Sequence, residues 1–333
     1  AGFAVGAAER HAILPKTKPK ALNCALPFAH GRFVAVFDAE DRPDPWQLRA
    51  ALDAFHLHGT DTACAQASLR IDNLTHSLLS RMFAIEYAGQ FDAFLPGMAQ
   101  LGLPLPLGGS SNHFRTDILR EVGGWDSHNV TEDADLGFRL SRFGYRSVTF
   151  SSATFEEAPI AFGGWLRQRT RWMKGWVQTW LVHMRRPWRL WQEAGPSAFF
   201  TLNLIVGGNV LTALAYPILI YAFFARLIVA AMSGAPLAFL AEWPAPLHLA
   251  AIVAGYLSTI VVGFIGLAKI GQLRRGWVLA LTPLYWLCLS AAAWRAVWHY
   301  VKDPYHWEKT QHGVVTRHEP AASVNTTSAT AHR

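Results

Sequence analysis

The apolar residues of this chain are concentrated in its second half. Three stretches beyond Gly195 contain no Asp, Glu, Lys or Arg: residues 197–225, 243–268 and 276–294, of 29, 26 and 19 residues. A helix needs about 20 apolar residues to cross the core of a bilayer, and a charge at its centre costs roughly 2.5–3.5 kcal/mol. Helices buried in a soluble core would be expected to keep polar faces, so the pattern predicts an all-α transmembrane region over residues 197–298.

The charges between these stretches predict how the chain is oriented. The segment 269–275 contains three basic residues and is therefore expected on the cytoplasmic side. This gives three crossings with the N-terminal domain in the cytoplasm. Alternatively, residues 197–212 form an interfacial helix before a crossing that includes Pro217, and a fourth crossing returns residues 299–333, a post-membrane segment and disordered tail, to the cytoplasm.

The first half of the chain alternates between two other patterns. Short apolar runs at 33–37 and 63–71 are typical of strands, and helical spacing is found at 45–58, 75–94 and 131–143. Such alternation predicts a layered α/β domain with a largely parallel sheet over residues 1–160. In open α/β sheets, ligands bind at the carboxyl ends of the strands.

Composition and charge sharpen this division. The chain is 51% hydrophobic and 16% charged, with a formal net charge of +7, which excludes an intrinsically disordered protein. Eighteen of the 23 acidic residues precede residue 160, whereas residues 160–195 contain seven Lys or Arg, one acidic residue and six of the 14 Trp. We therefore predict that residues 161–196 form interfacial helices that contact anionic lipid headgroups. Because this basic segment adjoins the apolar runs, nucleic acid is not an expected partner.

Acidic residues follow the first predicted strand. Asp38, Glu40 and Asp41 fall within four positions, and carboxylates two residues apart on a loop can bind one divalent cation. A solvated turn explains the same pattern. Thr131 and the two acids after it are likewise compatible with an ordinary helix start or with a general base above a cleft.

The basic-aromatic segment contains a third candidate group. Gln168, Arg171 and Trp172 lie within one and a half helical turns. Arginine binds phosphate oxygens through two parallel hydrogen bonds, and a tryptophan ring offers a flat face on which a sugar can stack. Each group is weak evidence alone.

Taken in order, the groups are specific. Asp38-Ala-Glu40, Thr131-Glu-Asp133 and Gln168-Arg-Thr-Arg-Trp172, followed by transmembrane helices, resemble the D-x-D, T-E-D and Q-x-x-R-W signatures of membrane-bound family 2 glycosyltransferases, which include cellulose, chitin and hyaluronan synthases. Residues 18–23 and 108–112 resemble that family's donor segment and its small-residue stretch near the acceptor. Residues 305–310 resemble its post-membrane segment, which favours four crossings.

The resemblance implies a glycosyltransferase-A-like domain that moves a sugar, with inversion, from a nucleotide-sugar donor to a glycan or lipid-linked acceptor. UDP-sugars are the first expectation for the donor. The protein would be integral to the inner or plasma membrane, in contact with membrane lipids, with its catalytic domain in the cytoplasm.

The resemblance also assigns roles to individual residues. Asp133 would be the catalytic base, and Mg²⁺ or Mn²⁺ would be held by Asp38 and Glu40. The expected donor-binding residues are Lys20, Asn23, Asp38 and Arg171. The expected acceptor-binding residues are Gln168 and Trp172.

Two departures qualify the resemblance. Glu40 replaces the second acid of D-x-D and has Asp41 beside it. In addition, nothing before Lys20 supplies the family's earlier nucleotide-contacting Asp, so we expect that an N-terminal part is missing. The alternative function is a non-catalytic membrane scaffold derived from such an enzyme. A transporter is disfavoured because the apolar runs are uncharged, whereas transport sites usually place polar groups at the membrane midplane.

Overall fold

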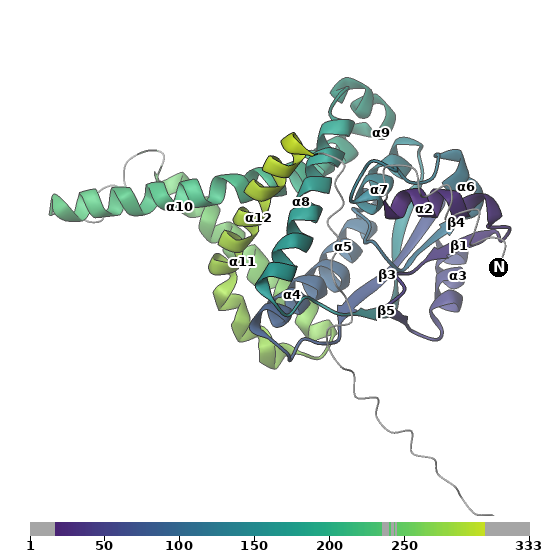
Figure 1. The fold of residues 1–333 in the computed structure, drawn as a ribbon, viewed down its shortest axis with the longest axis horizontal. Coiled ribbons are helices and arrows are strands. Elements are labelled where there is room, and N and C mark those ends of the chain that lie inside the picture. The colour runs from purple at the N-terminus through teal and green to yellow at the C-terminus, as the bar shows by residue number, and fades with distance from the viewer. Residues whose placement is uncertain (1–16, 235–239, 241–242, 244, 304–333) are drawn as a thin grey trace, which may run out of the picture.

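The computed structural model describes residues 17–234, 240, 243 and 245–303. Its centre is a five-stranded sheet in the order β1-β4-β3-β5-β2 (Figure 1). The strands are β1 (Phe33–Val36), β2 (Arg42–Pro43), β3 (Thr62–Ile71), β4 (Asn112–Arg115) and β5 (Arg146–Glu156). The predicted strands at 33–37 and 63–71 are confirmed as β1 and β3.

The sheet is mixed, which corrects the prediction of a largely parallel one. The pair β3–β5 is parallel, whereas β1–β4, β3–β4 and β2–β5 are antiparallel. It follows that β1, β3 and β5 point in the same direction, as alternation with helices predicts. Two strands are not predicted from the sequence: β4, which inserts between β1 and β3 in the opposite direction, and the short β2 at the edge of the sheet.

Helices cover both faces of the sheet (Figure 1). They are α2 (Lys18–Ala25), α3 (Gln47–His58), α4 (Leu78–Gly89), α5 (Leu95–Gln100), α6 (Thr116–Glu121) and α7 (Glu132–Arg142), with short turns of other helix types at Leu26–Phe28 and Gln90–Phe94. On one face, Phe55 of α3 packs against Ala65 and Val148. The opposite face packs on the main core, which includes Phe83 and Leu136. The layered α/β architecture is thus confirmed.

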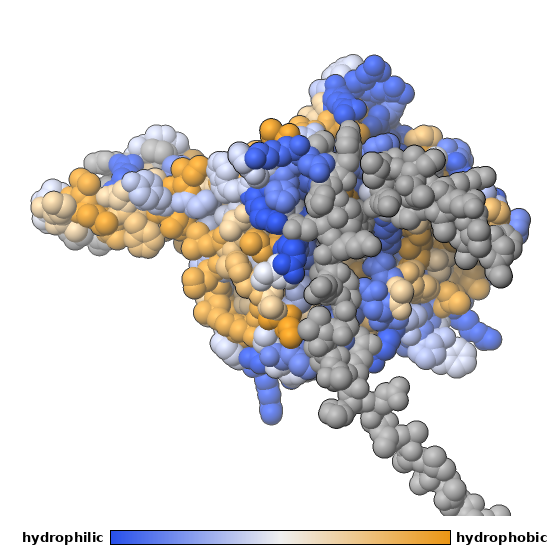
Figure 2. All heavy atoms as spheres, in the orientation of Figure 1, coloured by the Kyte–Doolittle hydropathy of each residue, from blue (hydrophilic) through white to orange (hydrophobic). Residues whose placement is uncertain are grey.

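The rest of the described chain is helical. It comprises α8 (Phe162–His183), α9 (Pro187–Thr201), a π-helical stretch η3 (Leu202–Gly207), α10 (Gly208–Met232), α11 (Ala245–Lys269), a 3₁₀ stretch η5 (Leu273–Leu281) and α12 (Thr282–Lys302). Within this described part, three helical segments are long and apolar enough to cross a membrane: Pro187–Met232, Ala245–Lys269 and Leu273–Lys302. In Figure 2 apolar surface gathers over the projecting α10 and over α11. The number and direction of crossings stay predictions, and residues 305–310 and 319–333 lie outside the described residues.

Helix α11, the 3₁₀ stretch η5 and helix α12 pack directly on the α/β domain. Leu267, Leu279 and Tyr285 belong to the same buried cluster as Phe83 of α4. The backbones of α11 and α4 are also in close contact at Gly266. A Cβ added there would lie 2.3 Å from the carbonyl carbon of Ala88. The two halves of the chain therefore share one continuous core.

Helix α8 differs from the prediction in how it uses its aromatic residues. Trp176 and Trp180 pack against the cluster around Phe138 and Leu202, and the Trp180 indole donates a hydrogen bond to Asn203 Oδ1 at 3.0 Å. These two aromatic side chains therefore pack within the protein, against apolar residues of α7, α9 and η3. The interfacial placement of residues 161–196 stays a prediction, to which α9 contributes the 69% exposed Trp188.

Candidate active site

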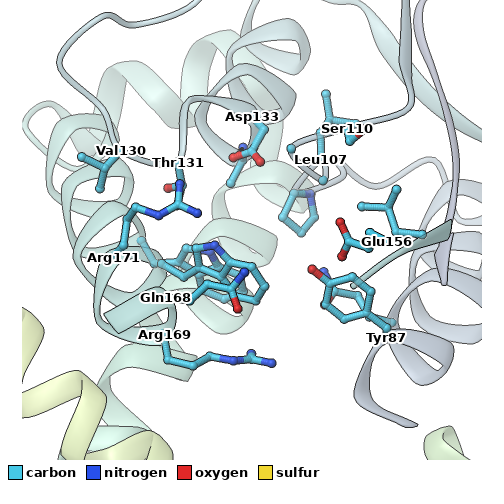
Figure 3. Close-up of a pocket in the computed structure, with 18 of the residues that line it drawn as sticks. Tyr87, Leu107, Ser110, Val130, Thr131, Asp133, Glu156, Gln168, Arg169 and Arg171 are labelled. Atoms are coloured by element: carbon cyan, nitrogen blue, oxygen red, sulfur yellow. Dashed lines mark hydrogen bonds between the residues drawn. The ribbon is translucent and has the colours of Figure 1, made fainter. Parts of the chain in front are cut away.

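A cavity of about 380 Å³ lies where the carboxyl ends of β1 and β5 meet α7 and α8. Its lining includes the start of α2, the loop after β1, residues 106–110, the start of α7 and one face of α8, together with residues of α4, β5 and α12. The three predicted motifs meet here, since the lining residues include Asp38, Glu40, Thr131, Asp133, Gln168, Arg171 and Trp172. Figure 3 shows Asp133 and Arg171 approaching the cavity from one side and Glu156 from the other.

The start of α7 is held against α8 by side-chain hydrogen bonds. Asn129 Oδ1 accepts from the Thr131 N–H at 3.0 Å, and its amide donates to Thr179 Oγ1 at 2.8 Å. Gln178 Oε1 accepts from the Val130 N–H at 3.3 Å. The Thr131 side chain does not cap α7, because Asn129 Oδ1 accepts hydrogen bonds from both the backbone N–H and the hydroxyl of Thr131. The helix ends close to the limit of the helical spacing at residue 143, and Gly144 follows with φ 83°.

Asp133 has the environment of a base. Burial raises the pKa of its carboxyl, while the Ala134 N–H and the cations Lys18 and Arg171 oppose that rise. The neighbouring Glu132 is buried, and its pKa is raised by burial and by Asp133. Raised pKa values make both carboxylates stronger proton acceptors than they would be in water.

Lys18 connects two walls of the cavity. Its ammonium donates to the Asp38 carboxylate and, at 2.7 Å, to the Gly109 carbonyl oxygen. Burial lowers its pKa, but Asp38, Glu132 and Asp133 together raise the pKa above its ordinary value. Lys18 is therefore a cation placed among the acidic residues of the site.

Two of the predicted donor-binding residues lie outside the cavity lining. Lys20 and Asn23 are not among the residues that line the cavity. Asn23 instead ties α2 to a neighbouring loop, donating to the Trp125 carbonyl at 2.6 Å and accepting from the Trp125 N–H at 2.9 Å. Residues two positions apart lie on opposite sides of a helix, so Lys18, and not Lys20, points to the cavity.

The loop after β1 carries the candidate cation ligands. Asp38, Glu40 and Asp41 line the cavity, and Asp41 Oδ1 is buried without a hydrogen-bond partner. Burial, and then the charges of Asp38 and Glu40, raise the Asp41 pKa to about 6 although Ser110 donates to it.

Within the described residues, no three His, Cys, Asp or Glu side chains converge as a metal site made of protein alone. Mg²⁺ and Mn²⁺ are usually held by one or two carboxylates together with substrate phosphates. The carboxylates after β1 therefore fit a cation shared with a bound diphosphate.

The α8 wall presents both polar and aromatic groups. Gln168 is 6% exposed, and its side-chain oxygen is buried without a hydrogen-bond partner; Figure 3 shows the side chain toward the cavity. The Trp172 ring is stacked near Tyr87, with ring centroids 6.2 Å apart at 23°. A ligand hydroxyl could satisfy the Gln168 oxygen.

The opposite wall was missed by the sequence analysis. Glu156, the last residue of β5, lines the cavity and is hydrogen-bonded by Tyr87, and Figure 3 shows the two side chains together. Burial, and then the charge of Asp41, raise the Glu156 pKa to about 8. The β-branched and aromatic alternation Val148, Phe150 and Thr154 could have revealed the strand that places it.

Comparison with known proteins identifies the family. Residues 33–229 match the Glycosyl transferase family group 2. The chain belongs to this family. It is 29% identical over 168 residues to the probable glycosyltransferase YdaM of Bacillus subtilis, a stretch that is 48% of this chain and 38% of that protein. It is 30% identical over 144 residues to glucomannan 4-beta-mannosyltransferase 1 of Oryza sativa subsp. japonica, covering 43% of this chain and 27% of the relative.

The fold of this family 2 chain also has a solved counterpart. It is similar to the mannosyltransferase PcManGT from Pyrobaculum calidifontis, solved in complex with GDP-Man and Mn²⁺, with a TM-score of 0.57 and 18% identity. The similarity covers 86% of this chain and 67% of that one, and it establishes the glycosyltransferase-like fold. The matched stretches span well under half of the two curated relatives, at 38% and 27% of their lengths.

Proposed function

We propose that this protein is an inverting hexosyltransferase, integral to a membrane, that moves a sugar from a nucleotide-sugar donor to a glycan or lipid-linked acceptor. The observation that carries the proposal is the position of Asp133, at the start of α7 in a cavity that also contains Lys18 and Arg171. A carboxylate with a raised pKa beside two cations is what deprotonating an acceptor and binding a diphosphate require.

In the proposed reaction, Asp133 takes the proton from the acceptor hydroxyl as that oxygen bonds to the anomeric carbon. The bond from this carbon to the diphosphate breaks on the opposite side, which inverts the configuration. Lys18 and Arg171 stabilise the negative charge of the leaving diphosphate. Gln168 accepts a hydrogen bond from the acceptor, and Trp172 offers it an apolar face.

The carboxylates of Asp38 and Glu40 would hold Mg²⁺ or Mn²⁺. A bound cation would neutralise charge on the diphosphate. The Mn²⁺ and GDP-Man bound to PcManGT and the mannosyltransferase name of the rice relative support a cation and a GDP-mannose donor here. We therefore put GDP-mannose first among the donors and UDP-sugars second.

Sugar transfer in purified membranes tests the proposal. The full chain is supplied with GDP-mannose or a UDP-sugar and Mn²⁺, and product is followed by radiolabel and its anomeric configuration by NMR. Asp133→Asn should reduce kcat by roughly 10²–10⁴, the usual contribution of a positioned base. The matched control is Asp117→Asn, an exposed acid on α6, which should transfer at the wild-type rate.

Two outcomes contradict parts of the proposal. Undiminished transfer by Asp133→Asn removes the base assignment. Absence of transfer and of donor binding across the whole donor panel favours the alternative, a non-catalytic scaffold derived from a glycosyltransferase.

A further inference from the structure

A polar network joins three elements that are far apart in sequence. Arg169 of α8 donates through both terminal nitrogens to the two carboxylate oxygens of Glu86 on α4, each at 2.6 Å. The hydroxyl of Tyr285 on α12 donates to Glu86 Oε2 at 2.7 Å. That hydroxyl in turn accepts from the Trp165 indole at 3.1 Å. Glu86 is therefore held by one residue of α12, a candidate membrane-spanning helix, and one residue of α8.

The surroundings fix the geometry of the network. The Arg169 side chain is 6% exposed, and its guanidinium lies over the rings of Phe83 and Trp172 at 4.4 and 4.6 Å. Bidentate carboxylate pairs are strong and directional, and removing one partner leaves a buried charge uncompensated. The guanidinium therefore has little freedom to move without moving the Trp172 ring beneath it.

The network lies directly against the α8 wall of the cavity. Arg169 follows Gln168 in sequence, and Glu86 precedes Tyr87; all four line the cavity. On α12, Leu289 lies one helical turn beyond Tyr285 and also lines the cavity. A shift of α12 would thus change the cavity in two ways, through the hydrogen bond from Tyr285 to Glu86 and through the apolar side chain of Leu289.

We propose that Glu86, Arg169 and Tyr285 are positioning residues through which α12 sets the orientation of the acceptor-binding wall formed by Gln168 and Trp172. This inference rests on the proposed function for the identity of the ligand at that wall. The inference goes beyond the proposed function because it makes acceptor binding depend on the placement of α12, a candidate membrane-spanning helix. Displacing a positioning group by about 1 Å can cost on the order of 10²-fold in rate, so a small displacement of α12 suffices.

The test removes one hydroxyl. Tyr285→Phe deletes the hydrogen bond to Glu86 and keeps the ring, and Tyr145→Phe is the matched control. The hydroxyl of Tyr145 donates to Glu121 of α6 at 2.7 Å, so this control removes a tyrosine–glutamate hydrogen bond of the same length that does not involve α12. Both variants are made in the full chain, reconstituted in lipid nanodiscs. A second variant, Arg169→Lys, keeps the charge but loses the bidentate geometry.

Two readouts are measured on each variant. The first is steady-state kinetics, in which the KM for the acceptor is compared with the KM for the donor and with kcat. The second is the ¹⁹F resonance of 5-fluorotryptophan at position 172, assigned by its loss in Trp172→Phe. We expect Tyr285→Phe and Arg169→Lys to raise the acceptor KM by about tenfold, the size of one hydrogen bond to a charged group. The donor KM should be unchanged, and the Trp172 resonance should move.

The outcomes separate this inference from the proposed function. If the wild-type chain transfers no sugar, the proposed function fails, and the ¹⁹F resonance still decides whether α12 positions Trp172. If Tyr285→Phe matches Tyr145→Phe in both acceptor KM and Trp172 resonance, the inference is overturned, even where the variant loses thermal stability.

Discussion

Gly175 of α8 lies directly against the side chain of Thr131, so closely that a Cβ at position 175 would be 2.2 Å from Thr131 Oγ1. Thr131 immediately precedes α7, and Asp133 lies two residues further on. Contact between this glycine and this threonine therefore sets how close the proposed base lies to the α8 wall.

Replacing that glycine should move the base. We expect Gly175→Ala to lower the free energy of unfolding by about 1–3 kcal/mol, the usual effect of overpacking, and to reduce kcat because Asp133 shifts with Thr131. The double variant Gly175→Ala/Thr131→Ala should recover part of both losses. Gly164→Ala is the control on the same helix, since its Cβ would meet only Pro159 at 3.7 Å. Thermal unfolding in detergent and transfer kinetics check this, and equal behaviour of the two alanine variants would contradict it.

The two lysines of α2 provide a matched pair. Lys18 contacts Asp38 and Gly109 in the cavity, whereas Lys20 does not line it. We expect Lys18→Met to weaken binding of a nucleotide diphosphate by roughly tenfold or more, because a charge-assisted hydrogen bond contributes about 1.5–3 kcal/mol. Lys20→Met should bind like the wild type. Calorimetric titration with GDP and Mn²⁺ measures both, and a larger loss in Lys20→Met would restore the sequence-based assignment.

A buried charge cluster behind α7 should make stability depend on pH. Asp135 accepts from His183 at 3.1 Å and lies 3.2 Å from an Arg139 guanidinium nitrogen. Burial opposes ionisation, but His183 and Arg139 hold the pKa of Asp135 below its ordinary value of 3.8. A group whose pKa is depressed on folding stabilises the protein above its unfolded pKa, and this stabilisation is lost as the pH falls through the folded pKa.

Asp135→Asn should therefore destabilise the protein by about 2 kcal/mol at pH 7, since His183 and the partly buried Arg139 lose a charged hydrogen-bonding partner. The difference in stability between the wild type and Asp135→Asn should become smaller below about pH 4. Thermal unfolding monitored across pH 3–8 checks the direction. A gap that stays constant over this range would show that the Asp135 carboxylate contributes no charge interaction.

How far the sequence reaches differs from element to element. The helix over 132–142 and the strand over 62–71 could be predicted because their apolar spacing is local. Strand β4 could not be predicted, since its four residues are too few to show an alternation of apolar and polar positions. They form a strand only because they pair with β1 on one side and β3 on the other. Glu156 was missed with its strand, and Lys18 was passed over for Lys20 because the orientation of α2 depends on contacts such as that between Asn23 and Trp125.

The sequence by itself determined which parts of this chain are apolar enough to enter a membrane, where its acidic and basic residues fall, and the motif residues by which it resembles its family. These properties depend on residue type and spacing over a few turns. Only the tertiary structure decided the direction of each strand and which lysine reaches the cavity. It also decided that Glu86, Arg169 and Tyr285 form one hydrogen-bonded network. The reason is physical: Glu86 and Tyr285 are 199 positions apart, and only the packing of α12 on the α/β domain brings their side chains within hydrogen-bonding distance.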